Sequence, residues 1–82
     1  MKQITYRTAA AKALRKMQPS IAKRIVSKIE AYAENPEAFA GNVVTLQGRE
    51  GIRLRVGDYR VIMLDGEVLD VIDIGNRREI YR

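Results

Sequence analysis

Residues 51–74 read GIRLRVGDYRVIMLDGEVLDVIDI, and this stretch decides the fold. Its first part alternates apolar residues with Arg53 and Arg55, which is the period of two expected for a strand with one buried face. The dipeptides Gly-Asp at 57–58 and Asp-Gly at 65–66 are typical of tight hairpin turns. The sequence therefore predicts three antiparallel strands joined by two hairpins, a β-meander.

The residues before this stretch change from strand to helical periodicity. Residues 2–7, KQITYR, alternate polar and apolar side chains and predict a short N-terminal strand. Thr8 is expected to cap a helix formed by AAAKALRKM, residues 9–17, because its hydroxyl suits the N-cap position. Pro19 ends that helix or begins the next one, since proline is tolerated in the first helical turn.

A longer amphipathic helix follows. Its apolar residues recur every three or four positions, at Ile21, Ile25, Ile29 and Tyr32. This spacing predicts about four helical turns with one apolar face. The segment ENPEAFAGN, residues 34–42, ends the helix, because a residue that precedes proline is pushed out of helical geometry. VVTLQG, residues 43–48, predicts a further strand.

These elements predict one α+β domain that spans residues 1–82. We expect the N-terminal strand and the helical hairpin to pack on one face of a sheet of three or four antiparallel strands. Tyr6, Tyr32 and Tyr59 are expected to pack in or beside the core. The opposite face of the sheet is then open for function.

The composition excludes several classes of protein. The 82 residues include no cysteine and no histidine, which excludes disulfides, thiolate chemistry, the commonest zinc ligands and the commonest general base. No apolar run approaches the roughly 20 residues that span a bilayer, and no apolar segment follows Lys2 as in a signal peptide. We expect a soluble, cytoplasmic protein without a metal, another cofactor or a membrane partner.

The positive net charge favours an anionic partner, and nucleic acid is the first candidate. The net charge is +5, and the first 47 residues hold eight basic and three acidic side chains, whereas the rest hold seven of each. Every cation after residue 47 is an arginine, whose planar guanidinium binds phosphates or carboxylates in a bidentate manner. The helix cations are expected to form solvated surfaces: Lys12, Arg15, Lys16, Lys23, Arg24 and Lys28.

A cluster of arginines is expected on the open face of the sheet. Its members are Arg53, Arg55 and Arg60 in the first hairpin, and Arg77, Arg78 and Tyr81 in the C-terminal GNRREIYR. The acidic residues available to neutralise them are Asp58, Asp70, Asp73 and Glu79. The cluster is therefore either a site for an anion or an ordinary salt-bridged surface.

The C-terminal half resembles a known family in the order of its motifs. An arginine-bearing strand, GDYR at 57–60, an apolar strand and IGNRREIY at 74–81 are similar to the pattern of the RelE/ParE superfamily, the toxins of bacterial toxin–antitoxin pairs. The upstream strand and the two helices fit as well, so the resemblance covers nearly all of the chain. It implies the RelE-like fold of microbial ribonucleases.

The resemblance implies a toxin that cleaves messenger RNA in the ribosomal A site without a metal. In that reaction the 2′-hydroxyl attacks the adjacent phosphate and leaves a 2′,3′-cyclic phosphate and a 5′-hydroxyl. By motif, Arg53 matches a residue that contacts the RNA phosphate. Arg60 and Arg77 match catalytic arginines, and Tyr81 matches a tyrosine that holds the substrate base. The supporting RNA-binding residues are Arg55 and Arg78.

The general acid and base stay open. Some ribonuclease members carry lysines at the positions of Gly51 and Arg53. Arginine stays protonated at neutral pH, which makes it a poor general base. Tyr81 and Glu79 are the alternatives.

Two other functions stay open from the sequence. The ParE-like branch shares the fold and acts on DNA gyrase without cutting RNA, and a further alternative is a non-catalytic RNA-binding relative. All of these predict a cognate antitoxin, acidic and partly disordered, that covers the arginine-rich face. The ribonuclease hypothesis adds the ribosome and mRNA as partners, with phosphate contacts from the helix cations to ribosomal RNA. DNA is expected only indirectly, through the antitoxin complex.

Overall fold

The computed structural model describes residues 2–76, which form an α+β fold as predicted. The elements in chain order are β1 (Ile4–Tyr6), α1 (Thr8–Lys16), α2 (Pro19–Glu34), the 3₁₀ helix η1 (Pro36–Asn42), β2 (Val43–Thr45), β3 (Ile52–Val56), β4 (Tyr59–Asp65) and β5 (Leu69–Asn76). No helix within this part of the chain is long and apolar enough to cross a membrane.

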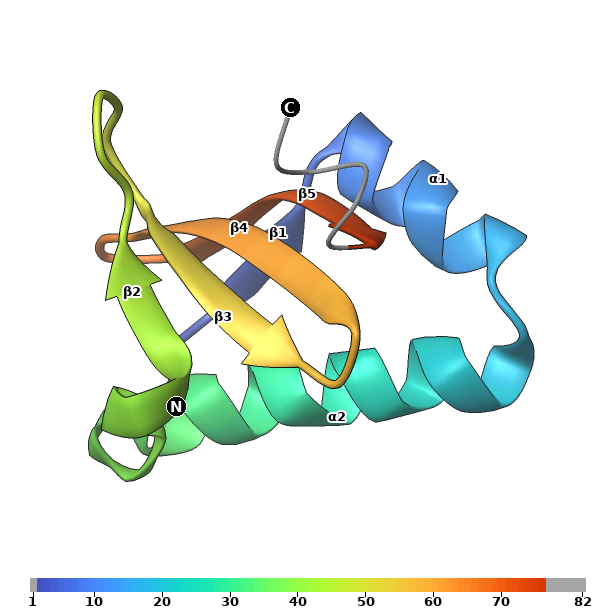
Figure 1. Ribbon diagram of the computed structural model, residues 1–82, viewed down its shortest axis with the longest axis horizontal. Coiled ribbons are helices and arrows are strands. Elements are labelled where there is room, and N and C mark those ends of the chain that lie inside the picture. The colour runs from blue at the N-terminus through green and yellow to red at the C-terminus, as the bar shows by residue number, and fades with distance from the viewer. Residues whose placement is uncertain (1, 77–82) are drawn as a thin grey trace.

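The sheet has five strands rather than the three or four expected, because the N-terminal strand, expected to pack on one face of the sheet, joins its edge instead. The strand order is β1-β5-β4-β3-β2. β2 to β5 are antiparallel neighbours, but β1 pairs with β5 in parallel, with Ile4 opposite Leu69 and Tyr6 opposite Val71. The meander is therefore correct, and the N-terminal strand extends it at the edge that β5 forms (Figure 1).

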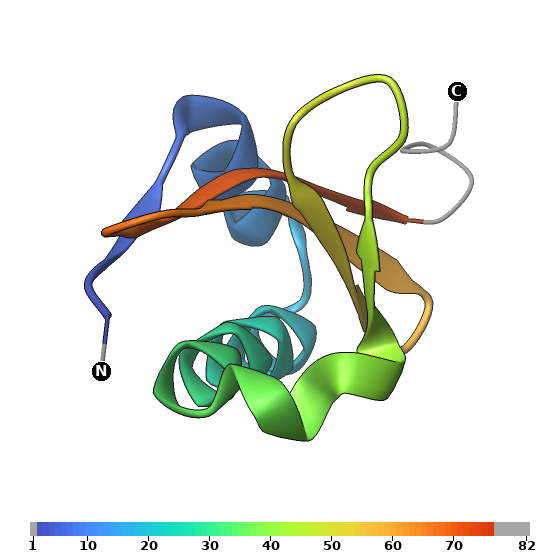
Figure 2. The ribbon, with the colours of Figure 1, turned by 90° about the vertical axis from the view of Figure 1, so that its left-hand side faces the viewer.

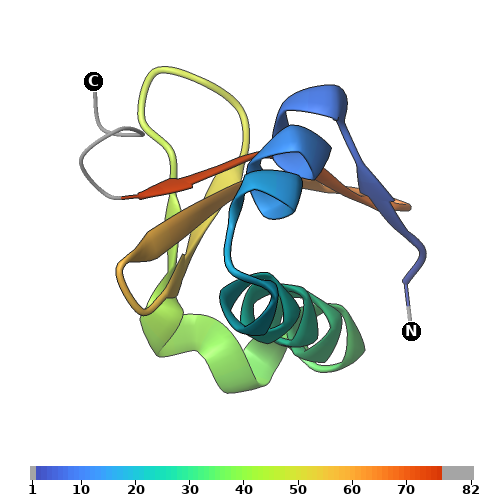
Figure 3. The same cartoon turned by 90° about the vertical axis from the view of Figure 1, so that its right-hand side faces the viewer.

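Both helices cover one face of this sheet, as expected. Figures 2 and 3 show α2 and η1 beneath the curved sheet, with α1 beside β5. The largest fully buried side chains come from α2 and from the alternating positions of β3, β4 and β5: Ile25, Ile29, Leu54, Val61, Met63, Leu69 and Val71. Tyr32 is buried with them, and Tyr6 and Tyr59 pack against this core, which confirms the expectation for all three tyrosines.

The helix starts differ in part from the sequence prediction. Thr8 is the first residue of α1 and Arg7 occupies the N-cap position without a side-chain cap hydrogen bond, so the predicted Thr8 cap was wrong. Pro19 begins α2, where its missing N–H costs nothing. α2 has 16 residues, which matches the predicted four turns.

A polar cluster at one end of the sheet ties together α2, the end of β4 and the segment before β1. The Tyr32 hydroxyl of α2 donates a 2.9 Å hydrogen bond to Asp65 at the end of β4, and Lys2 forms an ion pair with the same carboxylate. Burial and these contacts with Asp65 raise the pKa of Tyr32 to about 12. Burial alone raises the pKa of Asp65, but the hydrogen bonds from Lys2 and Tyr32 and the charge of Lys2 lower it overall.

Candidate functional site

Three of the predicted site arginines lie on the sheet face opposite the helices. Leu54 and Val56 of β3 face the core, so Arg53 and Arg55, which alternate with them, face outward. In the ladder between β3 and β4, Arg55 lies directly opposite Arg60. The hairpin thus brings two guanidinium-bearing residues to the same face within one cross-strand pair.

These arginines differ in their burial. Arg60 is 9% exposed, Arg53 is half-buried and Arg55 is exposed. The Arg60 Nη1 donates to the backbone carbonyl oxygens of Tyr59 at 3.1 Å and Gly57 at 3.4 Å. The guanidinium of Arg60 is therefore oriented by the hairpin that carries it, whereas the Arg55 side chain extends into solvent.

The described part of β5 ends beside this pair. Gly75 lies opposite Arg60, and Asn76 lies opposite Tyr59. The predicted residues Arg77, Arg78 and Tyr81 follow directly in the sequence but lie outside the described residues. Their roles in the site stay predictions.

Two of the carboxylates expected to neutralise the arginine cluster have other partners. Asp70 accepts bonds from the Arg7 guanidinium, with 2.8 Å from Nε and 2.8 Å from Nη2, and a 3.0 Å bond from the Thr5 hydroxyl. Asp73 accepts the backbone N–H of Ile74 at 2.9 Å. Asp70 thus anchors β1 to β5.

The backbone explains why position 51 carries no lysine here. Gly51 has a φ of +126°, a conformation that side chains rarely adopt, and a Cβ there would lie 2.9 Å from the Met63 carbonyl oxygen. Any side chain at position 51 therefore collides with the backbone of β4. The cation that some relatives place there has no room in this chain.

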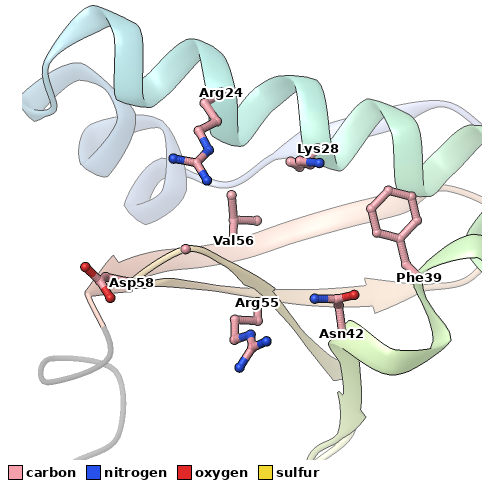
Figure 4. A pocket seen from close by; sticks show the side chains of 8 residues that line it. Arg24, Lys28, Phe39, Asn42, Arg55, Val56 and Asp58 are labelled. Carbon is pink, nitrogen blue, oxygen red and sulfur yellow. The ribbon is translucent and has the colours of Figure 1, made fainter.

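A groove between α2, η1 and β3 was missed by the sequence analysis. It has a volume of about 430 Å³ and is lined by Arg24, Lys28, Phe39, Asn42, Arg55, Val56, Gly57 and Asp58. Figure 4 shows Arg24 and Lys28 on α2 at one side of the opening, Arg55 and Asn42 at the other, and Phe39 at one end. The spacing of Arg24 and Lys28, one helical turn apart, was the only sequence signal for it.

Among residues 2–76, no three acidic side chains come together in a group that could hold a metal ion. What this part of the chain offers is guanidinium and ammonium groups on the open sheet face and along the groove.

Comparison with known proteins places this fold among bacterial and archaeal toxins. The profile of the family described as "ParE toxin of type II toxin-antitoxin system, parDE" matches residues 4–81. No curated protein sequence matches the chain significantly.

Several solved structures share the fold. The RelE–RelB complex from Pyrococcus horikoshii matches with a TM-score of 0.75 and 24% identity over 93% of this chain and 94% of that one. The RelB–RelE complex from Methanococcus jannaschii gives a TM-score of 0.73 and 22% identity over 94% of both chains. The isolated E. coli RelE toxin gives 0.70 and 25% identity over 99% of this chain and 92% of that one.

Proposed function

The chain belongs to the RelE/ParE superfamily of toxins from type II toxin–antitoxin systems, and we propose that it is a ribosome-dependent endonuclease of mRNA. The observation that carries the proposal is the pairing of Arg55 with Arg60 on the open sheet face, next to the strand that leads to Arg77. Guanidinium groups on one face are suited to a phosphodiester, because they bind its oxygens in a bidentate manner.

The proposed reaction needs electrostatic stabilisation more than a metal. The RNA 2′-oxygen forms a bond to the adjacent phosphorus and gives up its proton, while the bond from phosphorus to the 5′-oxygen breaks and that oxygen takes a proton. The products are a 2′,3′-cyclic phosphate and a 5′-hydroxyl. Negative charge on the phosphate oxygens is greatest in the transition state, where one fixed donor commonly contributes roughly 3 kcal/mol.

The side chains have separate roles in this proposal. Arg60, held by the carbonyl oxygens of its own hairpin, is the preorganised donor to the phosphate. Arg53 and Arg77 add further contacts to the phosphate, and Tyr81 holds a substrate base by stacking. Arg55 and Arg78 bind the neighbouring phosphates. Either Tyr81 or Glu79 serves as the general base that accepts the proton of the 2′-hydroxyl.

We also propose a cognate antitoxin as the partner that controls the toxin in the cytoplasm. The similar structures from P. horikoshii and M. jannaschii are complexes of RelE with RelB, which supports this partner. An acidic antitoxin segment is suited to the arginine-rich face. Contact with DNA then arises only through that complex.

The test is to map RNA ends in a purified translation system. With ribosomes, mRNA and this protein, we expect cuts within the A-site codon, each with a 5′-hydroxyl downstream and a cyclic phosphate upstream. Arg77→Ala and Tyr81→Ala should each reduce cutting at least tenfold, whereas Arg49→Ala, at an exposed arginine outside the cluster, should not. Arrested translation with intact mRNA would overturn the proposal.

Gyrase binding is the second candidate, because the matching family profile bears the ParE description. A supercoiling assay with purified DNA gyrase separates the two. Inhibition of supercoiling at stoichiometric toxin, together with intact mRNA in the translation system, would favour this candidate. The proposed endonuclease should leave supercoiling unchanged.

A further inference from the structure

We propose that the groove between α2, η1 and β3 binds one nucleotide of a single-stranded RNA beside the cleavage site on the open sheet face, with Arg55 at the border of both. Its cations would hold the phosphate, and Phe39 with Asn42 would hold the base. The inference uses the proposed function only to choose RNA as the nucleic acid.

The charge of the groove favours an anionic ligand. Arg24, Lys28 and Arg55 all line it, and Asp58 is the only carboxylate among its described lining residues. Arg24 and Lys28 lie one turn apart on α2, so their side chains share a helix face. Within residues 2–76, these three cations form no hydrogen bond or ion pair with one another or with a carboxylate. A bound phosphate would therefore offset the repulsion between these three positive charges.

The shape of the groove gives the base a place as well. Phe39 is half-buried at one end, and its ring is held edge-on against Tyr32 with centroids 6.1 Å apart and an interplanar angle of 69°. A fixed aromatic ring is a suitable platform for a base. The Asn42 side chain supplies both an amide donor and an acceptor for a base edge. The volume of about 430 Å³ lies in the usual range for small-ligand sites.

Arg55 connects the groove with the open sheet face. β2 pairs with β3 only at Ile52–Leu54, so among residues 2–76 no strand lies beside Arg55 on that edge. The Arg55 side chain therefore borders the groove while its position in the ladder is opposite Arg60. An RNA strand that lies along the open face has a continuous path over this edge to Lys28 and Arg24.

The test is the binding of a fluorescent 2′-O-methyl RNA oligonucleotide, which lacks the attacking hydroxyl and cannot be cleaved. The double variant Arg24→Ala/Lys28→Ala should weaken binding roughly tenfold near 100 mM salt and lower the salt slope of log K by about 0.7, because one phosphate contact to a single strand contributes about 0.7. Lys12→Ala/Arg15→Ala, an equal charge change on the exposed surface of α1, should cause less than a twofold change.

The base contact has its own test. Phe39→Leu keeps an apolar side chain against the core but removes the ring face, so binding should weaken about tenfold for RNA and not for the same backbone with abasic sites. If Phe39→Leu unfolds the chain, photo-crosslinking of 4-thiouridine RNA to the wild-type protein replaces it. The crosslinked peptide should contain residues 36–42.

Three outcomes would overturn the inference. The first is an equal loss of RNA affinity in the two double variants, and the second is crosslinks confined to the open sheet face. The third is unchanged RNA affinity in Arg24→Ala/Lys28→Ala together with weaker binding of a poly-glutamate peptide. The last would assign the groove to an acidic protein segment. Because the oligonucleotide cannot be cut, binding in the groove is measured independently of A-site cleavage.

Discussion

Arg55 and Arg60 lie directly opposite each other in the ladder between β3 and β4, yet Arg55 is exposed and Arg60 is only 9% exposed. Their strands explain the difference. β4 is flanked by β3 and β5, whereas in the described part of the chain no strand pairs with β3 beyond Leu54 on its outer edge. Like charges in a direct cross-strand pair repel, and the carbonyl oxygens of Gly57 and Tyr59 partly offset this for Arg60.

This difference predicts that Arg60 contributes to stability as well as to function, whereas Arg55 contributes to function alone. Arg60→Ala should lower the free energy of unfolding by roughly 1–3 kcal/mol, because it removes a buried charged side chain and its hydrogen bonds to the hairpin. Arg55→Ala should change it by less than about 0.5 kcal/mol, as is usual for exposed sites, and still reduce mRNA cutting. Urea unfolding gives the first quantity and the translation system gives the second. Equal destabilisation by both variants would contradict the assignment.

Position 51 gives a second prediction. Gly51→Lys restores the lysine of some relatives, but it should destabilise the fold by roughly 1–3 kcal/mol, because the positive φ and the Met63 carbonyl leave no room for a side chain. Gly41→Lys is the matched control, since nothing lies within 4 Å of a Cβ at that position. Thermal unfolding compares the two. Unchanged stability and increased cutting in Gly51→Lys would show that the backbone adapts.

Local patterns were sufficient for most of the fold. The strands β3, β4 and β5 follow from alternation and from turn dipeptides, and α2 follows from the spacing of its apolar residues. The pairing of β1 with β5 was not predictable in this way, because Thr5 and Asp70 are 65 positions apart and no local pattern specifies their contact. The number of strands in the sheet was predicted wrongly for the same reason.

For the candidate site, the sequence predicted only which face of the sheet the arginines occupy. Alternation places Arg53 and Arg55 outward, and the hairpin places Arg60 beside them. Alternation carries no information on whether an outward side chain turns back to its own backbone, so the burial of Arg60 was missed. The groove was missed because it depends on where α2 crosses the edge of β3, and Arg24 and Lys28 looked like ordinary exposed helix cations.

Alkaline pH should remove a stabilising contribution from Tyr32. Its pKa is raised from 10.0 to about 12, through burial and through the hydrogen bond and charge of Asp65. Since the folded pKa lies above the unfolded one, the contribution is complete below pH 10 and is lost as the pH rises through about 12. The difference in unfolding free energy between the wild type and Tyr32→Phe should therefore shrink over this interval. Urea titrations at several pH values measure it, and a difference independent of pH would contradict the prediction.

Tyr6 supplies the opposite case of a buried phenol. Its hydroxyl is buried without a hydrogen-bond partner among the described residues, and burial together with the charge of Glu30 raises its pKa. Removal of a polar atom that has no partner relieves a desolvation cost, so Tyr6→Phe should keep or raise the free energy of unfolding, by up to about 1 kcal/mol. The matched variant Tyr32→Phe deletes a hydroxyl that donates to Asp65 and should lower it by about 1–2 kcal/mol at neutral pH. Urea unfolding of the two variants in the same buffer decides the matter: a loss of more than about 1 kcal/mol in Tyr6→Phe would mean that this hydroxyl has a partner, such as an ordered water, that stabilises the fold.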